Sequence, residues 1–317
     1  MLTLLLLAFI TGCASYFVGT PDGRGVFWLH RIAGFGLLGL LCWKVPIVVR
    51  AYRRRGATVS GALSALLGVL FLSSLVFGLL WSTVGVPGVR LPLLGALTGL
   101  GVHVLLACTM LPLLTWHTLA RWPRVRGRIA DFAGRRALLR YGALSIAGFA
   151  LWRTSEALAG AERRFTGSRE RGSFTGNRFP ATNWLSDPKP QVDPALWSLH
   201  ISGQVRRATR LSHAEFVALP VAQHDAILDC TGGWYTRQFW SGPTLSTLLA
   251  LVEPMDGAQS IVVRSQTGYS RRFSIDDSSR LLLATHVSGE PLSRGHGFPA
   301  RLVVPGERGY AWVKWVS

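Results

Sequence analysis

The sequence predicts an N-terminal all-α transmembrane bundle of about five helices, followed by a C-terminal α+β domain. Apolar residues make up 49% of the 317 residues, whereas only 16% are charged. Long stretches before residue 155 contain no charged residue, which is typical of membrane-spanning helices. After residue 176, short apolar runs alternate with turn residues, which is typical of a domain that mixes strands and helices.

We expect a transmembrane domain over 1–153, a linker over 154–176 and a second domain over 177–317. The linker prediction follows from a polar, glycine-containing composition with mixed charges. The first and last of the five apolar segments are short, because about 20 residues are needed to cross a bilayer. The five segments are 2–18, 26–49, 59–81, 91–119 and 137–152.

The distribution of arginine predicts how the helices are oriented. The loops at 50–56 and 121–136 are rich in arginine, whereas 19–25 and 84–90 carry little positive charge. Because cytoplasmic loops are enriched in Lys and Arg, we expect a multi-pass protein of a bacterial-type plasma membrane. Its N-terminus would be cytoplasmic and everything after residue 153 extracytoplasmic. This pattern explains much of the net charge of +18, so we expect no nucleic-acid partner.

Three histidines lie inside or at the edge of apolar segments, where ionisable residues are costly and usually functional. His103 and His117 are 14 residues apart, which places them within about 40° on one helix face and about 21 Å apart along the axis. This spacing resembles the paired-histidine helices of quinone-linked b-type cytochromes. The same spacing from His30 leads to Lys44, so only one pair is complete.

We therefore expect one haem b, ligated by His30 and His103, with His117 as a further candidate ligand. His117 could instead bond a backbone carbonyl or line a quinone site. In the competing hypothesis, all three histidines only form hydrogen bonds within the bundle and no haem is bound.

The second domain is expected to hold many short strands and few helices. Ser212 followed three residues later by Glu215 predicts the start of a short helix, and 240–249 predicts a turn leading into another. Strands are predicted at 197–203, 227–230, 260–265, 270–275, 281–287, 301–304 and 312–316.

Cys230 is the cysteine that lies outside the apolar first half. In the stretch ILDCTGGWY, an apolar run leads into the cysteine, a Gly-Gly turn and two aromatic residues. A glycine-rich turn after a strand lets a large ligand approach the backbone closely. The competing interpretation is a buried cysteine that acts only as a small apolar side chain.

The stretch 289–315 contains HGFPARLVVPG followed by VKW. This pattern resembles the molybdopterin domain of the sulfite oxidase family, which includes eukaryotic sulfite oxidases, plant nitrate reductases and bacterial periplasmic methionine sulfoxide reductases. The resemblance covers about 174–317 and implies a Mo-molybdopterin cofactor whose metal is ligated by one cysteine. Cys230 is the matching position, and a soft thiolate suits that metal.

The resemblance also implies further site residues. Arg301 and Lys314 match basic positions that suit phosphate recognition. Sulfite oxidases carry an arginine pair shortly after their cysteine, whereas Trp234 here makes the pattern closer to the bacterial reductases. The cofactor-binding candidates are Asn177, Arg178, Thr231, His296, Gly297, Arg301 and Lys314; the catalytic candidates are Cys230, Trp234 and Tyr235; candidates for anion contacts are Arg237, Arg271 and Arg272.

Two short motifs concern anchoring and export. Residues 10–13 resemble a lipoprotein cleavage box ending at Cys13, although no Lys or Arg precedes it, and a plain first helix is the competing interpretation. Arg135 and Arg136 resemble a twin-arginine signal, with a positive-inside pair as the alternative. A domain that folds around its cofactor in the cytoplasm would suit the twin-arginine export machinery.

These features predict a membrane-anchored molybdenum oxidoreductase that transfers an oxygen atom to or from a small oxo-substrate. Electrons would pass through the haem b to or from the quinone pool. A second hypothesis is a cofactor-free extracytoplasmic binding or sensor module on a membrane anchor. A third is a transporter-like membrane half, for which Lys44 is the one supporting charge inside those helices.

Overall fold

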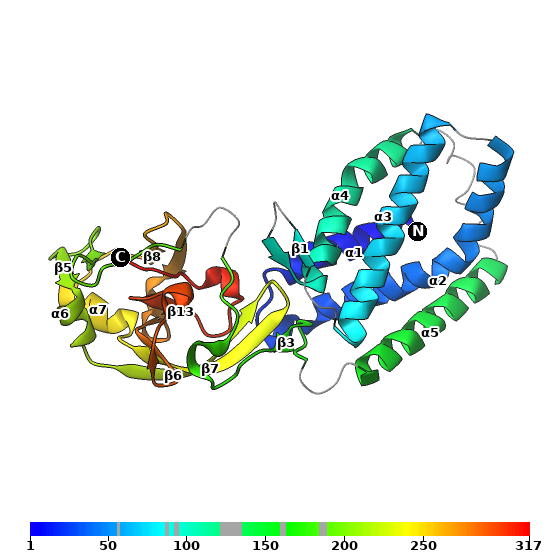
Figure 1. The fold of residues 1–317 in the computed structure, drawn as a ribbon. Coiled ribbons are helices and arrows are strands. Elements are labelled where there is room, and N and C mark those ends of the chain that lie inside the picture. The colour runs from blue at the N-terminus through cyan, green and yellow to red at the C-terminus, as the bar shows by residue number, and fades with distance from the viewer. Residues whose placement is uncertain (56–57, 86–88, 92–94, 121–134, 159–162, 184–188) are drawn as a thin grey trace. The chain divides into compact units, whose positions relative to one another are not determined.

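The computed structural model describes residues 1–55, 58–85, 89–91, 95–120, 135–158, 163–183 and 189–317. The chain divides into two compact units (Figure 1). The first unit comprises Met1–Tyr16 and Pro21–Gly167 and is mostly helical, whereas the second comprises Phe17–Thr20 and Ser168–Ser317 and contains most of the strands.

The first unit has a helix at each of the five predicted apolar segments. Threonine side chains cap two of these helices: Thr58 accepts a hydrogen bond from the Gly61 N–H, and Thr98 accepts one from the Gly101 N–H. The helices are α1 (Leu2–Ser15), α2 (Arg24–Arg55), α3 (Val59–Thr83), α4 (Gly99–Leu119) and α5 (Arg135–Leu158), with a short hairpin of β1 (Val89–Leu91) and β2 (Gly95–Leu97) before α4.

Three helical segments in the described part of the chain are long and apolar enough to cross a membrane: Pro21–Arg54, Val59–Thr83 and Gly99–Leu119. α1 is apolar but has only 14 residues. The predicted count of five spans and their orientation stay predictions. The basic loop at 121–136 falls mostly outside the described residues, apart from Arg135 and Arg136 at the start of α5.

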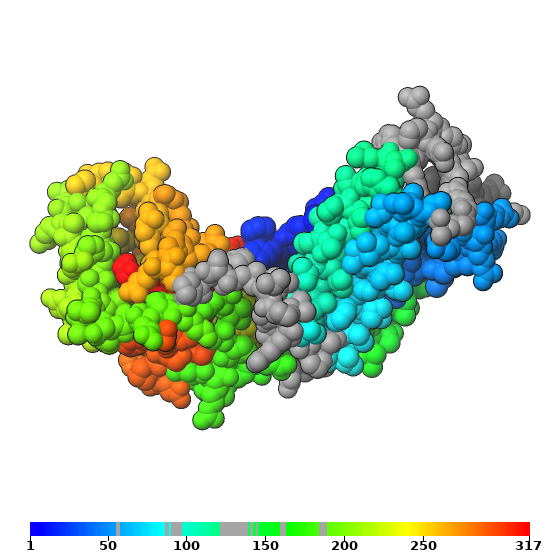
Figure 2. All heavy atoms as spheres, turned by 45° about the horizontal axis from the view of Figure 1, so that its top comes forward, coloured from blue at the N-terminus to red at the C-terminus, as the bar shows by residue number. Residues whose placement is uncertain are grey.

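The helices of the first unit pack in pairs. α3 lies along α4 (Figures 1 and 2), α1 along α2, and α2 along α5. Leu37, Phe71 and Met110 form a small buried core between them. Many large apolar side chains remain exposed, including Val59 at 80% and Ile10 at 62%, as expected for helices that face lipid.

A mixed sheet organises the second unit. The long strands β6 (Ala222–Cys230) and β7 (Trp234–Gly242) form an antiparallel hairpin. β7 also pairs in parallel with β3 (Arg169–Glu170) and antiparallel with β11 (His286–Val287), which in turn pairs with β12 (Glu290–Pro291). Trp240, which is fully buried on β7, lies in the core of the unit.

Shorter elements surround this sheet. Three antiparallel pairs are formed by β4 (Ser198–Ile201) with β5 (Thr209–Ser212), β8 (Ser260–Arg264) with β9 (Ser270–Ser274), and β10 (Leu282–Ala284) with β13 (Arg301–Val303). The helices are α6 (His213–Val217) and α7 (Leu245–Val252). The predicted helix start at Ser212 is confirmed, because Ser212 and Glu215 form a reciprocal capping box.

Strand β7 was not predicted, although its side chains alternate strictly between buried and exposed or half-buried positions. Two of its buried residues, Thr236 and Gln238, are polar, so the sequence of this strand does not alternate regularly between apolar and polar residues. Thr236 Oγ1 and Gln238 Nε2 both donate hydrogen bonds to the Gly172 carbonyl, at 3.1 and 2.6 Å. Residues of the predicted linker 154–176 therefore help to complete the sheet, and the helix before it continues to Leu158.

Two predicted strands differ in the structure. The run 281–287 divides into β10 and β11, because the two pieces pair with different partners. The run 312–316 is not a regular strand, since Trp315 has a φ of 52° and only Val316 forms an isolated bridge, to Ser265. A positive φ breaks extended pairing for a residue that is not glycine.

Replacing Gly242 should destabilise the second unit. A Cβ at Gly242 would collide with the carbonyl oxygen of Leu283, which belongs to the backbone and cannot move aside. We expect Gly242→Ala to cost about 1–3 kcal/mol of unfolding free energy or more. The matched control is Gly257→Ala, where no atom lies within 4 Å and only the positive φ of 89° adds a cost. Equal thermal unfolding midpoints for the two variants would contradict this prediction.

Candidate functional site

Cys230 is the last residue of β6 and lies directly opposite Trp234 in the hairpin. The turn between them closes through a hydrogen bond of 3.0 Å from the Gly233 N–H to the Cys230 carbonyl. The Gly232 N–H lies 3.3 Å from the Cys230 sulfur and donates to it. The Gly-Gly turn thus places a backbone N–H donor at the thiol. Cys230 lies at the end of a strand, as predicted.

Thr182 interacts both with Trp234, another predicted site residue, and with Cys230. The Trp234 Nε1–H donates to Thr182 Oγ1 at 3.2 Å, and the Thr182 side chain acts to lower the pKa of Cys230. Burial raises the pKa of the Cys230 thiol, whereas the Gly232 N–H, the Thr182 hydroxyl and the charge of Arg308 oppose that shift. Burial is the largest of these effects and favours the uncharged thiol, whereas the opposing groups are ones that would stabilise a thiolate bound to a metal.

Arg301 is a buried cation close to Cys230. Its guanidinium carbon lies 5.4 Å from the ring centres of both Trp240 and Trp312, and its Nη1 donates to the His296 carbonyl at 3.0 Å. Burial lowers the pKa of Arg301 to about 9, against the attraction of Cys230. Its Nε has no hydrogen-bond partner among the described residues, so a buried donor is left for a ligand.

A buried ion pair supports the backbone of Cys230 from behind. Arg308 Nη2 donates to the Cys230 carbonyl at 3.3 Å, and its Nη1 lies 3.5 Å from Asp229 Oδ1. Ser168 Oγ donates to the same carboxylate oxygen at 2.6 Å. Asp229 and Arg308 are 1% and 3% exposed, so this pair holds the end of β6 in a dry environment.

His296 is buried and uses both ring nitrogens. Its Nε2 lies 2.9 Å from the Phe179 carbonyl and must donate there, so its Nδ1 accepts from the Ser293 hydroxyl at 2.7 Å. Burial lowers the pKa of His296 to about 4, and the nearby charges of Arg301, Lys314 and Lys189 add to the shift. The local potential is therefore positive, which suits an anionic ligand.

Lys314 ties the segment after Phe179 to the HGFP turn. Its Nζ donates to the Thr182 carbonyl, Asn183 Oδ1 and the Gly295 carbonyl, at 2.9, 2.6 and 3.0 Å. Gly297 lies beside it with a φ of 112°, and a Cβ there would approach Arg301 Cβ to 3.1 Å and Lys314 Cβ to 3.3 Å. Glycine at 297 thus lets the two basic side chains converge.

The remaining candidates of this unit take other positions. Asn177 donates to Glu290 Oε2 and the Pro291 carbonyl and accepts from the Ser293 N–H. Arg178 is exposed and Thr231 is half-buried in the turn after Cys230. Tyr235 follows Trp234 on β7, so its side chain lies on the opposite sheet face from Cys230.

The arginines predicted for anion contacts engage other groups. Arg237 forms an exposed ion pair with Asp225. Arg271 lies over the rings of Tyr269 and Tyr310, with distances of 5.0 and 4.9 Å to the ring centres. Arg272 donates to the Ser260 hydroxyl at 2.6 Å. The arginine charges that act on Cys230 are those of Arg301 and Arg308.

The first unit brings His30 of α2 and His103 of α4 together. Their ring centres are 6.0 Å apart, with the planes at 86°. Each Nδ1 lies 2.8 Å from a backbone carbonyl, that of Ala8 for His30 and that of Ser74 for His103. Because a carbonyl oxygen only accepts, both Nδ1 atoms carry a proton, which leaves Nε2 as the nitrogen of each neutral ring that could bind a metal.

Glycines lie against both rings. A Cβ at Gly12 would lie 3.2 Å from His30 Cε1, and one at Gly78 would lie 3.0 Å from His103 Nδ1. His117, near the other end of α4, has its Nδ1 3.4 Å from the Ser64 hydroxyl. The structure thus brings together His30 and His103, the two histidines that the sequence predicts as a pair.

Comparison with known proteins finds similarities to the second unit. Residues 186–317 match the family described as oxidoreductase molybdopterin binding domain. An NADH nitrate reductase of Hordeum vulgare is 29% identical over 162 residues, or 40% of this chain and 18% of that protein. The mitochondrial sulfite oxidase of Homo sapiens is 29% identical over 176 residues, or 45% of this chain and 31% of that protein.

Residues 186–317 form an oxidoreductase molybdopterin binding domain. The match supports a molybdopterin-dependent oxidoreductase. Among solved structures, the sulfane dehydrogenase SoxCD from Paracoccus pantotrophus is similar, with 26% identity and a TM-score of 0.39 over 40% of this chain and 38% of that one. The matches span less than a third of the length of the two relatives named above.

The residues of the molybdopterin domain fit such a cofactor. They combine a sulfur at a strand end, a buried guanidinium with an unpaired Nε, and a glycine that lets Arg301 and Lys314 converge. Sequence reasoning missed Thr182, Lys189 and Arg308. Asp229 was the one available signal for the supporting pair, since a carboxylate inside an apolar strand needs a buried partner.

The neutral state of His296 should make the stability of the domain depend on pH. An unfolded histidine takes up a proton below about pH 6.5, whereas His296 stays neutral in the fold until about pH 4. The stability that neutral His296 contributes is therefore present above pH 6.5 and is lost as the pH falls toward 4, up to about 2–3 kcal/mol.

Thermal unfolding of the full chain, measured between about pH 7 and pH 4.5, tests this dependence. His296→Gln should lose stability less steeply than the wild type as the pH falls. His200→Gln, which replaces an exposed histidine on β4, should follow the wild type. Parallel curves for the wild type and His296→Gln would exclude a buried neutral imidazole.

Proposed function

We propose that the chain is a membrane-anchored molybdenum oxidoreductase that transfers an oxygen atom to or from a small oxo-substrate. The observation that carries this proposal is Cys230, whose sulfur meets a backbone donor, a hydroxyl and the charges of Arg301 and Arg308 inside the matched domain. Each of these partners favours a charged sulfur and so opposes the effect of burial, as suits a thiolate that ligates a metal.

Several residues of this chain would hold the cofactor. Cys230 would bind the metal through sulfur, and the unpaired Nε of Arg301 would donate to the pterin. Arg301, Lys314 and Lys189 supply the positive potential that a phosphate requires. His296 would keep the segment at Phe179 in place rather than bind the ligand itself, because both its nitrogens are already bonded. When bound, the cofactor supplies two-electron oxygen-atom transfer.

The supporting groups prepare the sulfur before any ligand binds. Trp234 fixes the Thr182 hydroxyl, and Gly232 presents its N–H, so the negative charge of a thiolate meets two oriented donors. Arg308 holds the Cys230 carbonyl and thereby the end of β6. Preorganised donors of this kind stabilise charge in a water-poor site without further rearrangement.

Removing the sulfur should remove the metal while leaving the fold intact. In Cys230→Ala, produced in a host that makes molybdopterin, we expect molybdenum to fall at least about tenfold and oxidoreductase activity to be lost. Molybdenum by elemental analysis and the unfolding midpoint should be measured on the same samples. Cys108→Ala, which replaces an exposed cysteine of α4, is the matched control and should keep its metal. Full molybdenum in Cys230→Ala would sink the assignment.

We also propose that His30 and His103 ligate one haem b, through which electrons pass to or from the quinone pool. The observation that supports this pair is the proximity of the two rings, whose centres lie 6.0 Å apart on α2 and α4. Ligating histidines usually donate their other N–H to a carbonyl, as both do here. Glycine at 12 and at 78 lets these two rings pack closely against α1 and α3.

Single substitutions separate this pair from the third histidine. We expect His30→Ala and His103→Ala to lose most of the reducible haem absorption, because each removes one of the two proposed ligands. His117→Ala should retain it, since the partner expected from the spacing is Lys44. The measurement is the reduced-minus-oxidised spectrum of purified protein, with molybdenum content as the control for folding. Haem that survives both the His30 and the His103 substitution would contradict the assignment.

The membrane location and the partners belong to the same proposal. Three apolar helices and many exposed apolar side chains support anchoring, with the N-terminus cytoplasmic and the molybdopterin domain extracytoplasmic. Because the domain would fold around its cofactor before export, the twin-arginine machinery is the proposed route. Tethering the two halves in one chain keeps the electron donor at high effective concentration.

A further inference from the structure

Ser168 is a fully buried serine that lies directly before β3 and contacts the strand that ends at Cys230. Its Oγ donates a hydrogen bond of 2.6 Å to Asp229 Oδ1. Ser168 lies outside the stretch 186–317 that matches the molybdopterin binding family. The surroundings of Cys230 are therefore completed by a part of the chain that the family match does not include.

The backbone after Ser168 supports the turn that follows Cys230. The Arg169 N–H donates to the Gly233 carbonyl at 2.9 Å, and the Gly233 N–H donates to the Cys230 carbonyl at 3.0 Å. β3 extends this contact by pairing in parallel with β7, where Arg169 lies opposite Trp234. The Ser168 side chain thus acts on the residue before Cys230, and the backbone beside it acts on the end of the turn.

The carboxylate that Ser168 contacts also pairs with Arg308. Arg308 Nη1 lies 3.5 Å from the same Asp229 Oδ1, and its Nη2 donates to the Cys230 carbonyl at 3.3 Å. The Ser168, Asp229 and Arg308 side chains are all buried. Hydrogen bonds to a charged group are strong in such a water-poor environment. Loss of the Ser168 hydroxyl would remove one of the groups that fix Asp229, and with it the position of the guanidinium at Cys230.

The effect of Ser168 on the sulfur is indirect. Asp229 and Cys230 are consecutive residues of β6, so their side chains lie on opposite faces of the sheet. A Cβ at Gly309 would lie 3.3 Å from both the Asp229 carbonyl oxygen and Cys230 Cα, so the chain next to Arg308 packs closely against the strand end. A shift of Arg308 would therefore be transmitted to the backbone of Cys230.

We propose that Ser168 is a positioning residue that fixes Cys230 through Asp229 and Arg308, and thereby tunes the reduction potential of a metal bound to Cys230. This proposal rests on the proposed function, in which Cys230 ligates molybdenum. Partners beyond the ligands themselves typically change the affinity or activity of a metal site by about 10- to 100-fold. If the hydroxyl only satisfied a buried carboxylate, its loss would lower stability without changing the potential.

Replacement of Ser168 by alanine should lower the reduction potential of the bound molybdenum. Without the hydroxyl, the negative charge of Asp229 is compensated less, so the electron-rich reduced metal is stabilised less. We expect Ser168→Ala to change the equilibrium between oxidised and reduced metal about tenfold, which corresponds to about 59 mV for a one-electron step. Redox titration of the full chain, loaded with molybdenum, measures this change.

Three further variants separate positioning from a loss of stability. Ser168→Thr keeps the hydroxyl and should restore the wild-type potential. Ser265→Ala removes the hydroxyl of another buried serine, which bonds to Thr267, and should leave the potential unchanged. Ser168→Ala/Asp229→Asn should differ little from Asp229→Asn alone, because Ser168 acts through that carboxylate. An unchanged potential in Ser168→Ala, or additive shifts in the double variant, would overturn the proposal.

Hydrogen exchange tests the positioning without requiring a bound metal. In the full chain carrying Ser168→Ala, we expect the Gly232 and Gly233 amides to exchange about tenfold faster, because the strand end that accepts their hydrogen bonds is held less tightly. Unchanged exchange of these amides would also overturn the proposal. Molybdenum content of the wild type reports separately on the proposed function: its absence would refute that function, while the exchange rates would still show whether Ser168 holds the turn.

Discussion

The arrangement of the second unit depends on one constraint, which is the burial of a sulfur and two guanidinium groups at the end of one hairpin. Cys230, Arg301 and Arg308 lie there together, and Asp229 is the acidic side chain that pairs with Arg308. Removing such charges from water is expensive unless partners compensate. The two tryptophans around Arg301, the Gly-Gly turn and the HGFP turn each supply part of that compensation. A negatively charged ligand would supply the remainder, and this requirement connects the fold to its chemistry.

The sequence predicted the centre of this site but not its surroundings. Cys230 could be found because a strand, a cysteine and two glycines are contiguous, and Arg301 and Lys314 because they belong to one motif. Thr182 and Arg308 could not, because neither stands in a distinctive local pattern and both reach Cys230 only through the fold. Strand β7 was missed because Thr236 and Gln238 occupy buried positions, where a carbonyl from a distant segment satisfies them.

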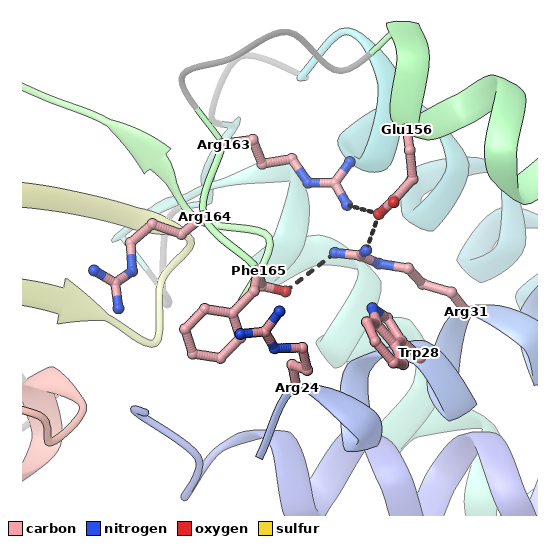
Figure 3. Close-up of a pocket in the computed structure, with 7 residues that line it drawn as sticks. All are labelled: Arg24, Trp28, Arg31, Glu156, Arg163, Arg164 and Phe165. Atoms are coloured by element: carbon pink, nitrogen blue, oxygen red, sulfur yellow. Dashed lines mark hydrogen bonds and ion pairs between the residues drawn. The ribbon is translucent and has the colours of Figure 1, made fainter. Parts of the chain in front are cut away.

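In the first unit, too, some features could be predicted from the spacing of residues along a helix, whereas others depend on how the helices pack. The relation between His30 and His103 followed from counting residues along two helices, and the two side chains do meet. The ion pairs of Glu156 with Arg31 and Arg163 (Figure 3) could not be predicted in the same way, because these residues come from α2, α5 and the chain after α5. Helix α2 therefore carries a histidine on one face and Arg31 on another.

The central claim is that Cys230 contributes its sulfur to a molybdenum ion held by a pterin. X-ray absorption at the molybdenum edge of the purified wild-type chain tests this most directly, because it counts the sulfur atoms bound to the metal. We expect one sulfur more than the pterin dithiolene supplies, and we expect that extra sulfur to disappear if the cofactor is extracted from the protein. Molybdenum bound with only the sulfur atoms of the pterin would contradict the claim, and would leave the donors around Cys230 without a role in metal binding.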